Sequence, residues 1–91
     1  MNRLQWRLLS LVDRDAIMEY IARDNPSAAI DLDLEFELKT ENARQRPKLY
    51  NPGRMKGTRE IVMRPNYVMV YRVTGDLVEV LRVLHAAQQW P

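Results

Sequence analysis

The chain has 91 residues, one histidine, no cysteine and a formal net charge of +2 at pH 7. This length predicts one domain, residues 1–91, with a core just large enough to fold unaided. The lack of cysteine excludes disulfides and thiolate metal sites. No stretch approaches the roughly 18 apolar residues of a membrane span, and no signal peptide is evident. We therefore expect a cytoplasmic protein with no membrane partner.

The charge is divided unevenly along the chain. Residues 1–42 hold five Lys/Arg and nine Asp/Glu, whereas residues 43–91 hold nine Lys/Arg and three Asp/Glu. A basic half on a small domain predicts a polyanionic or acidic partner. A solvated surface with uneven charge is the alternative explanation.

The first predicted elements are a short strand within residues 2–8 and a helix that follows it. Ser10 is the expected N-cap of a helix running through Asp24, with Asp13 three residues later. Asp15 would lie in the first turn, near the positive end of the helix dipole. The helix should end before Pro26, because the residue before a proline avoids the α region. Its expected apolar face consists of Val12, Ala16, Ile17, Tyr20 and Ile21.

Residues 30–39, IDLDLEFELK, alternate between apolar and polar side chains, which is the pattern of a half-buried strand. Three observations favour a helix over residues 26–45 instead. Asn25 can cap it and Pro26 suits its first position. Only Ile30 is β-branched between residues 28 and 39, and the sequence stays helix-friendly until Pro47. The helix would carry two apolar stripes, one of Ala28, Leu32, Phe36 and Ala43, the other of Ile30, Leu34 and Leu38.

The remainder of the chain predicts strands. A turn-rich basic stretch, KLYNPGRMKG, precedes strand-like runs at residues 58–63, 67–73 and 77–84. Pro65-Asn66 and Gly75-Asp76 are turn signals between them, so the three strands should form an antiparallel meander. The predicted fold class is α+β, in the order β-α-α-β-β-β, with two helices against one curled sheet.

The strand motifs resemble a known family. GTREIVMRPNYVMVYRV and VEVLRVLHAAQQWP resemble the RelE/ParE superfamily, toxins of type II toxin–antitoxin modules. The ParE branch is closest, with its RE(I/L)V strand, P-x-Y-x-(V/I)-x-Y-R-V strand and R-V-(L/I)-H end. The IARDNPSAA junction and the spacing of Leu32, Phe36, Ala43 and Pro47 extend the resemblance over essentially the whole chain. It implies a helical hairpin packed on a curled, mainly antiparallel four-stranded sheet.

The superfamily has two activities, and the resemblance bears on both. RelE-type ribonucleases use Lys, Arg and Tyr on the sheet, without a metal, because RNA cleavage needs a base, an acid and cations. The candidate catalytic residues on that interpretation are Arg59, Lys56, Tyr67 and His85. The match to this branch is poor, since Ile61 stands where a second lysine is expected and Val68 where arginine is expected.

Structural roles are favoured for several of the polar and aromatic residues. His85 is expected to pack at a strand end with one ring nitrogen bonded to the backbone. Trp90 is expected to close the edge of the core instead of stacking on a base. Arg72 and Arg82 should form ion pairs with Glu60 or Glu79. No metal or cofactor site is evident from residue types and spacing.

The favoured hypothesis is a ParE-like toxin that inhibits DNA gyrase and is neutralised by a cognate antitoxin in a hetero-oligomer. One alternative is a RelE-like mRNA endonuclease that acts on the ribosome and its mRNA; another is a non-toxic, partner-binding relative. The residues expected to bind the target or a polyanion are Arg54, Lys56, Arg59 and Arg64. Ile30, Leu34 and Leu38 are the expected antitoxin contacts, because an acidic disordered segment can order on an apolar stripe.

Overall fold

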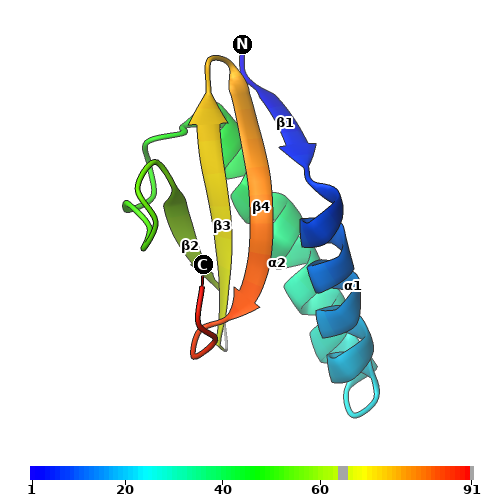
Figure 1. The fold of residues 1–91 in the computed structure, drawn as a ribbon. Helices are drawn as coiled ribbons and strands as arrows, with labels where there is room; N and C mark the ends of the chain where they lie inside the picture. The colour runs from blue at the N-terminus through cyan, green and yellow to red at the C-terminus, as the bar shows by residue number, and fades with distance from the viewer. Residues whose placement is uncertain (64–65, 91) are drawn as a thin grey trace.

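The computed structural model describes residues 1–63 and 66–90. The elements are β1 (Arg3–Trp6), α1 (Leu8–Ala22), α2 (Pro26–Gln45), β2 (Arg59–Met63), β3 (Tyr67–Thr74) and β4 (Leu77–His85). The four strands form one sheet, against which the two helices pack, and this confirms the predicted α+β class and element order. Figure 1 shows the arrangement. The strand order is β1-β4-β3-β2. The sheet is mixed, because β1 runs parallel to β4 and the other neighbours are antiparallel.

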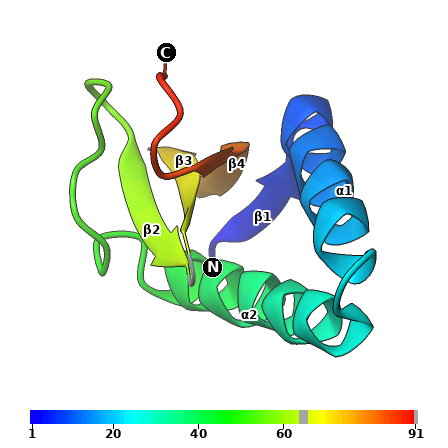
Figure 2. The same ribbon diagram turned by 90° about the horizontal axis from the view of Figure 1, so that it is seen from below.

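The two helices form a hairpin, and they cover the sheet differently. α2 lies across one face of the sheet, while α1 lies beside β1 and continues along the edge of β4 (Figures 1 and 2). The C-terminal segment after β4 returns over the opposite face, so Figure 2 shows it and α2 on opposite sides of the sheet. The main core lies between α2 and the sheet. Its buried residues are Leu32, Phe36, Ala43, Ile61, Met63, Met69, Tyr71, Val78, Val80 and Val83.

α2 is helical over the whole alternating stretch, as predicted. The Asn25 side-chain oxygen accepts a hydrogen bond from the Ala28 backbone N–H at 3.1 Å, and Pro26 occupies the first helical position. Leu32, Phe36 and Ala43 are buried at helical spacing. The cap and the spacing of the buried residues therefore override the strand-like alternation.

The predicted start of α1 is wrong. The helix begins at Leu8, Arg7 precedes it without a side-chain cap, and the first turn contains no acidic residue. Ser10 lies inside the helix, fully buried, and its hydroxyl donates to the Arg7 carbonyl at 2.6 Å. The reason is tertiary: the Arg7 N–H donates to the Val80 carbonyl at 3.0 Å, which extends the β1–β4 pairing up to the first turn of the helix. α1 also ends at Ala22, two residues earlier than predicted.

Asp13 joins α1 to the sheet edge. β1 pairs only with residues 77–80, so the edge of β4 beyond Val80 has no strand neighbour. The Asp13 carboxylate accepts hydrogen bonds there from the Val83 N–H at 3.0 Å and from Arg82 at 2.7 and 3.1 Å. The hydrogen bonds that Arg82 donates to Asp13 raise the pKa of Arg82. Arg82 thus pairs with Asp13, and the predicted pairing with Glu60 or Glu79 is wrong for this residue.

The remaining ion-pair prediction is correct, and the predicted apolar face of α1 is only partly so. Arg72 donates to Glu79 at 3.0 Å. Ile17 and Ile21 pack against the core, but Val12 and Tyr20 are 54% and 66% exposed. Because α1 lies along the sheet edge and not across its face, only a narrow side of it is covered.

Candidate functional site

The outer side of α2 carries a line of exposed aliphatic side chains, which we call the α2 stripe: Ile30, Leu34 and Leu38. They are 62%, 62% and 63% exposed, and their spacing of four residues aligns them along the helix. Carboxylates flank the stripe, and one of them, Glu35, pairs with Lys39 at 3.1 Å. A line of exposed aliphatic side chains on one side of a helix indicates an interaction surface. The residues predicted to bind the antitoxin are therefore accessible.

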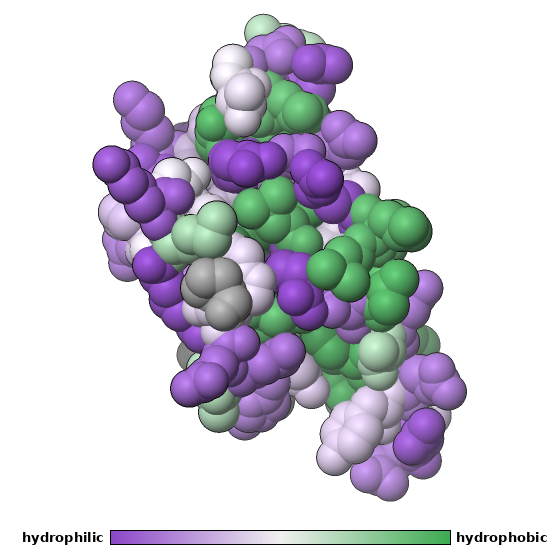
Figure 3. Space-filling view, in the orientation of Figure 1, coloured by the Kyte–Doolittle hydropathy of each residue, from purple (hydrophilic) through white to green (hydrophobic). Residues whose placement is uncertain are grey.

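A second apolar surface, which the sequence interpretation missed, lies at the start of α1. A groove of about 580 Å³ is lined by Arg7, Leu8, Leu9, Val12, Leu81, Arg82 and Trp90, and we call it the α1 groove. Leu8 and Leu9 are 78% and 51% exposed. Figure 3 shows hydrophobic residues gathered on this face of the molecule, over the start of α1. The paired leucines were its only sequence signal, and placing a helix cap at Ser10 concealed it.

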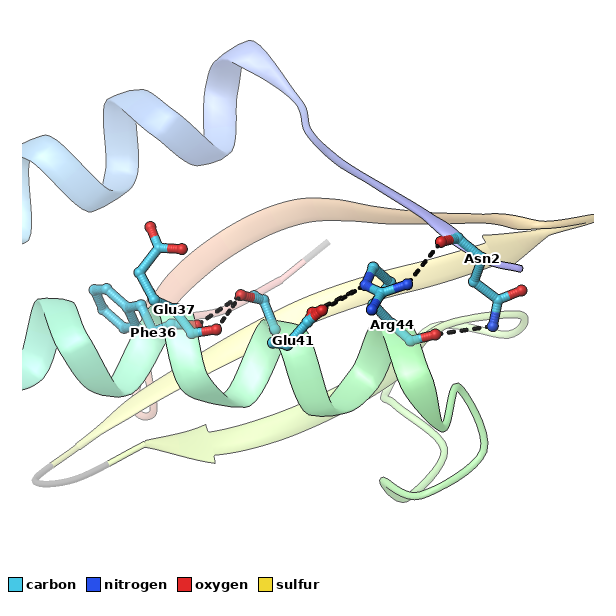
Figure 4. Close-up of polar contacts among 6 residues, drawn as sticks. Asn2, Phe36, Glu37, Glu41 and Arg44 are labelled. Atoms are coloured by element: carbon cyan, nitrogen blue, oxygen red, sulfur yellow. Dashed lines mark hydrogen bonds and ion pairs between the residues drawn. The ribbon is translucent and has the colours of Figure 1, made fainter.

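The end of α2 and the start of the segment that joins it to β2 are held in place by polar contacts. Arg44 donates to the Asn2 carbonyl at 3.1 Å, and the Asn2 amide donates to the Arg44 carbonyl at 2.8 Å (Figure 4). Beyond α2, the Tyr71 hydroxyl donates to the Pro47 carbonyl at 2.6 Å. Burial raises the pKa of Tyr71, with the nearby Arg59 charge opposing the rise. These contacts tie the end of α2 to Asn2, just before β1, and the start of the segment to β3.

This segment and its two flanks are strongly basic: residues 42–59, from the last turn of α2 to the first residue of β2, include six Lys/Arg and no Asp/Glu, and we call them the basic segment. Arg54 pairs with Glu60 at 3.3 Å and also donates to the Gln88 carbonyl at 3.0 Å. Lys56 is exposed on the loop. Arg59 is partly buried and donates to the Tyr50 carbonyl at 2.6 Å. Arg64, the fourth predicted polyanion contact, lies outside the described residues.

The four candidate catalytic residues do not converge. Tyr67 is level with His85 in the sheet, and their rings meet edge to face with centroids 5.8 Å apart. Arg59 is level with Tyr71. Four residues of strand separate Tyr71 from Tyr67, a distance of about 13 Å at about 3.3 Å per residue. Lys56 is further out, in the loop. General acid–base catalysis needs the acid and the base within hydrogen-bond reach of one reacting centre. Here Tyr67 and His85 lie together, while Arg59 and Lys56 lie elsewhere.

His85 and Trp90 make the contacts expected of structural residues. The Ala87 N–H donates to His85 Nδ1 at 3.2 Å, so one ring nitrogen is bonded to the backbone. Trp90 packs against Val68, Val70 and Leu84 on the sheet face opposite α2. The tail segment therefore closes a second, smaller apolar cluster.

Within residues 1–63 and 66–90, no three or more His, Asp or Glu side chains gather in a way that would hold a metal ion. No helix in the same ranges is both long enough and apolar enough to span a membrane.

Comparison with known proteins agrees with this fold. The family described as ParE toxin of type II toxin-antitoxin system, parDE, matches residues 4–90. Y4kP, a suspected toxin of Sinorhizobium fredii, is 39% identical over 91 residues, which cover 99% of this chain and 94% of that protein. Toxin RelE2 of Caulobacter vibrioides is 32% identical over 90 residues, covering 97% of this chain and 99% of that one.

Two solved structures share the fold. A chain of the chromosomal ParDE system from P. aeruginosa superposes with a TM-score of 0.83 at 20% identity, covering 93% of this chain and 96% of that one. A YoeB/ParE toxin from Agrobacterium tumefaciens gives a TM-score of 0.66 at 22% identity, covering 93% and 98%. The family match spans nearly the whole chain, and the two relatives align over 94% and 99% of their length. This chain therefore belongs to the ParE toxins of type II toxin–antitoxin systems, a membership that implies a cognate antitoxin.

Proposed function

We propose that this ParE-family toxin acts in the cytoplasm by binding and inhibiting DNA gyrase. The separation of the candidate catalytic residues carries this proposal: Arg59 lies about 13 Å along the sheet from Tyr67 and His85, at about 3.3 Å per strand residue. Cleavage requires acid, base and cations at one centre, whereas inhibition by binding requires only a complementary surface. The basic segment supplies such a surface through Arg54, Lys56 and Arg59.

One observation favours a second candidate, a metal-independent, ribosome-dependent mRNA endonuclease. Tyr67 and His85 line a cavity of about 270 Å³ that also includes Asp13 and Tyr20. A histidine and a phenol at one cavity are groups that proton transfer uses. On this interpretation Lys56 and Arg59 would have to reach the RNA at a distance from that cavity.

The deciding experiment measures both activities with the same purified toxin. We expect inhibition of gyrase supercoiling while ribosome-bound mRNA stays intact. Cleavage of the mRNA with gyrase unaffected would select the endonuclease, and inactivity in both assays would select a non-toxic relative. His85→Gln should abolish cleavage if the endonuclease interpretation is correct, and should change gyrase inhibition only modestly.

The basic surface is tested by a matched pair of charge reversals. Lys56→Glu should weaken gyrase inhibition at least tenfold, because an exposed cation at a contact surface is replaced by a repelling charge. Arg23→Glu is the control: Arg23 is also exposed, at the end of α1, and has only a 3.8 Å contact with Glu19. Equal losses from the two variants would show that net charge, and not the basic segment, controls inhibition.

The antitoxin is proposed to place its apolar anchors on the α2 stripe. The carboxylates beside the stripe require that the antitoxin residues there be neutral or basic, with any acidic residues lying over the basic segment. The α1 groove is the competing surface, because its exposed Leu8 and Leu9 can accept apolar anchors. Arg7, which also lines it, pairs with Glu79 but keeps 53% of its side chain exposed and can therefore face an acidic segment.

Two variants distinguish the surfaces. Leu34 and Leu9 are 62% and 51% exposed, so an aspartate at either position should leave the fold intact. Docking on the stripe predicts that Leu34→Asp lowers antitoxin affinity at least tenfold while Leu9→Asp changes it less than twofold. The reverse pattern, measured by titration calorimetry, would place the antitoxin in the α1 groove.

A further inference from the structure

Arg59 stands apart from the other arginines. The described residues include ten arginines, and eight of them form an ion pair with a carboxylate. The two exceptions are Arg46, which is exposed, and Arg59, which is partly buried. Removing a guanidinium from water without an anionic partner is costly. An unpaired, partly buried arginine therefore indicates a site that an anion completes.

Arg59 lines a cavity that fits this role. The cavity has a volume of about 350 Å³, and its walls include Lys48, Gly57 and Thr58 beside Arg59, with no carboxylate among the lining residues. A guanidinium has five N–H donors. Arg59 uses one nitrogen to hold the Tyr50 carbonyl at 2.6 Å, and it makes no other side-chain hydrogen bond within the described part of the chain. One contact thus orients the group while its other donors stay available.

The walls of the cavity are held by the loop's own hydrogen bonds. The Gly53 N–H donates to the Thr58 carbonyl at 2.8 Å, and the Thr58 N–H and hydroxyl donate to the Met55 carbonyl at 3.1 and 2.6 Å. A Cβ at Gly53 would lie 2.6 Å from the Thr58 hydroxyl, so only glycine permits this close packing. Gly57 has φ of +84°, a conformation that L side chains rarely adopt. Preorganised walls reduce the entropy lost on binding.

We propose that this cavity is a phosphate-binding site, with Arg59 as the oriented hydrogen-bond donor and Lys48 as a second cation. A guanidinium fork matches two oxygens of a phosphate, and a lysine adds a point charge for the remaining negative charge. The nucleic-acid backbone is the favoured source, because the two cations that line the cavity belong to a stretch, residues 42–59, that contains six Lys/Arg and no Asp/Glu. This proposal rests on the proposed function in one respect: Arg59 belongs both to the cavity and to the surface proposed to contact the target.

The test follows the side-chain Nε–H signals of Arg59 and Arg46 in NMR spectra of the full chain. Inorganic phosphate, titrated at constant ionic strength, should shift the Arg59 signal to saturation and leave the Arg46 signal in place. Acetate at the same concentrations should have little effect. An unmoved Arg59 signal, or equal shifts with acetate and phosphate, would overturn the proposal without needing any variant to fold.

Matched variants then measure the effect on affinity. Arg59→Gln should raise the dissociation constant for phosphate at least tenfold, since the charge and the paired donors are lost. Arg46→Gln removes an unpaired arginine from the same segment outside the cavity, and should change it less than twofold. Equal effects of the two substitutions would show that the basic segment attracts phosphate only through its net charge, and would overturn the proposal of a specific site.

A DNA duplex and inorganic phosphate distinguish the two sources of the group. A short duplex should shift the same Arg59 signal, and its affinity should fall as salt rises, with a slope of about −0.9 per neutralised phosphate. A response to inorganic phosphate but not to the duplex would overturn the nucleic-acid assignment and leave the site to a small phosphate compound. A chain that binds phosphate at Arg59 yet leaves gyrase active would refute the proposed function and not the cavity.

Discussion

The two apolar stripes of α2 are made of similar residues and have opposite fates. Leu32, Phe36 and Ala43 are 5%, 0% and 1% exposed, whereas Leu34 and its neighbours on the α2 stripe are about 60% exposed. Every residue in both sets is apolar, so the hydropathy pattern alone does not show which set is buried. Their direction on the helix does, because only one side of α2 meets the sheet (Figure 2). Burying a leucine side chain fully contributes about 1.5–3 kcal/mol. A partner that covers the α2 stripe would therefore gain binding free energy from each leucine that it buries.

The charges around α2 reinforce this division. Arg14 of α1 donates to Asp33 and Glu37 on one flank of α2, both at 2.7 Å, and lies 4.7 Å from the centre of the Trp6 ring. That flank is occupied by α1. On the other flank Lys39 pairs with Glu35 and donates to the Val62 carbonyl at 3.0 Å. The α2 stripe lies uncovered between the two flanks, so a partner could reach it without displacing either set of contacts.

The largest expected effect is at the centre of the buried stripe. Phe36→Ala should lower the free energy of unfolding by about 3–5 kcal/mol, because it removes a fully buried ring and leaves a cavity. Leu34→Ala, on the exposed stripe, should change it by less than about 0.5 kcal/mol. Urea denaturation of both variants measures the difference. Similar losses would show that the α2 stripe is covered in solution and would break the comparison.

Removing the link between the helices should have the next largest effect. Arg14→Ala should lower the free energy of unfolding by about 2 kcal/mol, in the range of hydrogen bonds to charged groups. Burial lowers the pKa of Arg14, but its hydrogen bonds to Asp33 and Glu37 outweigh this effect, so the pKa of Arg14 is raised. The control, Arg23→Ala, removes an arginine that is 70% exposed, and thermal unfolding should be nearly unchanged. Equal stability of the two variants would mean that α1 is held by the sheet alone.

Loss of the α2 cap should cost less, because it affects the helix end and neither stripe directly. Asn25→Ala removes the acceptor for the Ala28 N–H and should lower the free energy of unfolding by about 1 kcal/mol. Asn25→Asp keeps an acceptor and should retain most of the stability. If chemical denaturation shows the two variants to be equally destabilised, the side-chain cap is not what stabilises the start of α2.

The smallest expected effect concerns pH and lies on the sheet, away from α2. Hydrogen bonding from Arg72, with the added charge of Arg7, holds the pKa of Glu79 below its ordinary value of 4.5, although burial opposes this. A carboxylate with a lowered folded-state pKa stabilises the fold fully above its unfolded pKa. This stabilisation should therefore be present at pH 6 and lost as the pH falls below about 4.5 through the folded-state pKa. Glu79→Gln should flatten this part of the curve of urea midpoint against pH, and an unchanged curve would assign the effect to other carboxylates.

The sequence by itself determined the elements whose signals are local. Helix α2 is predicted by the Asn25 cap, by Pro26 at its first position and by the scarcity of β-branched residues. All three signals lie in the helix itself or directly before it. The strands β2, β3 and β4 follow from their β-branched runs and intervening turns, and their motifs were sufficient to indicate the ParE branch. Each of these signals acts through contacts between near neighbours, so no knowledge of distant partners was needed.

The tertiary structure decided whatever depends on pairing between distant residues. α1 begins at Leu8 because β1 pairs with β4, and Asp13 became a partner of the β4 edge because β1 is short. Which stripe of α2 is buried depends on which side meets the sheet. Arg59 lies at a cavity because the loop folds back on β2. Periodicity gives the spacing of residues on an element but not the direction that the element faces, and that direction is fixed only when the sheet assembles.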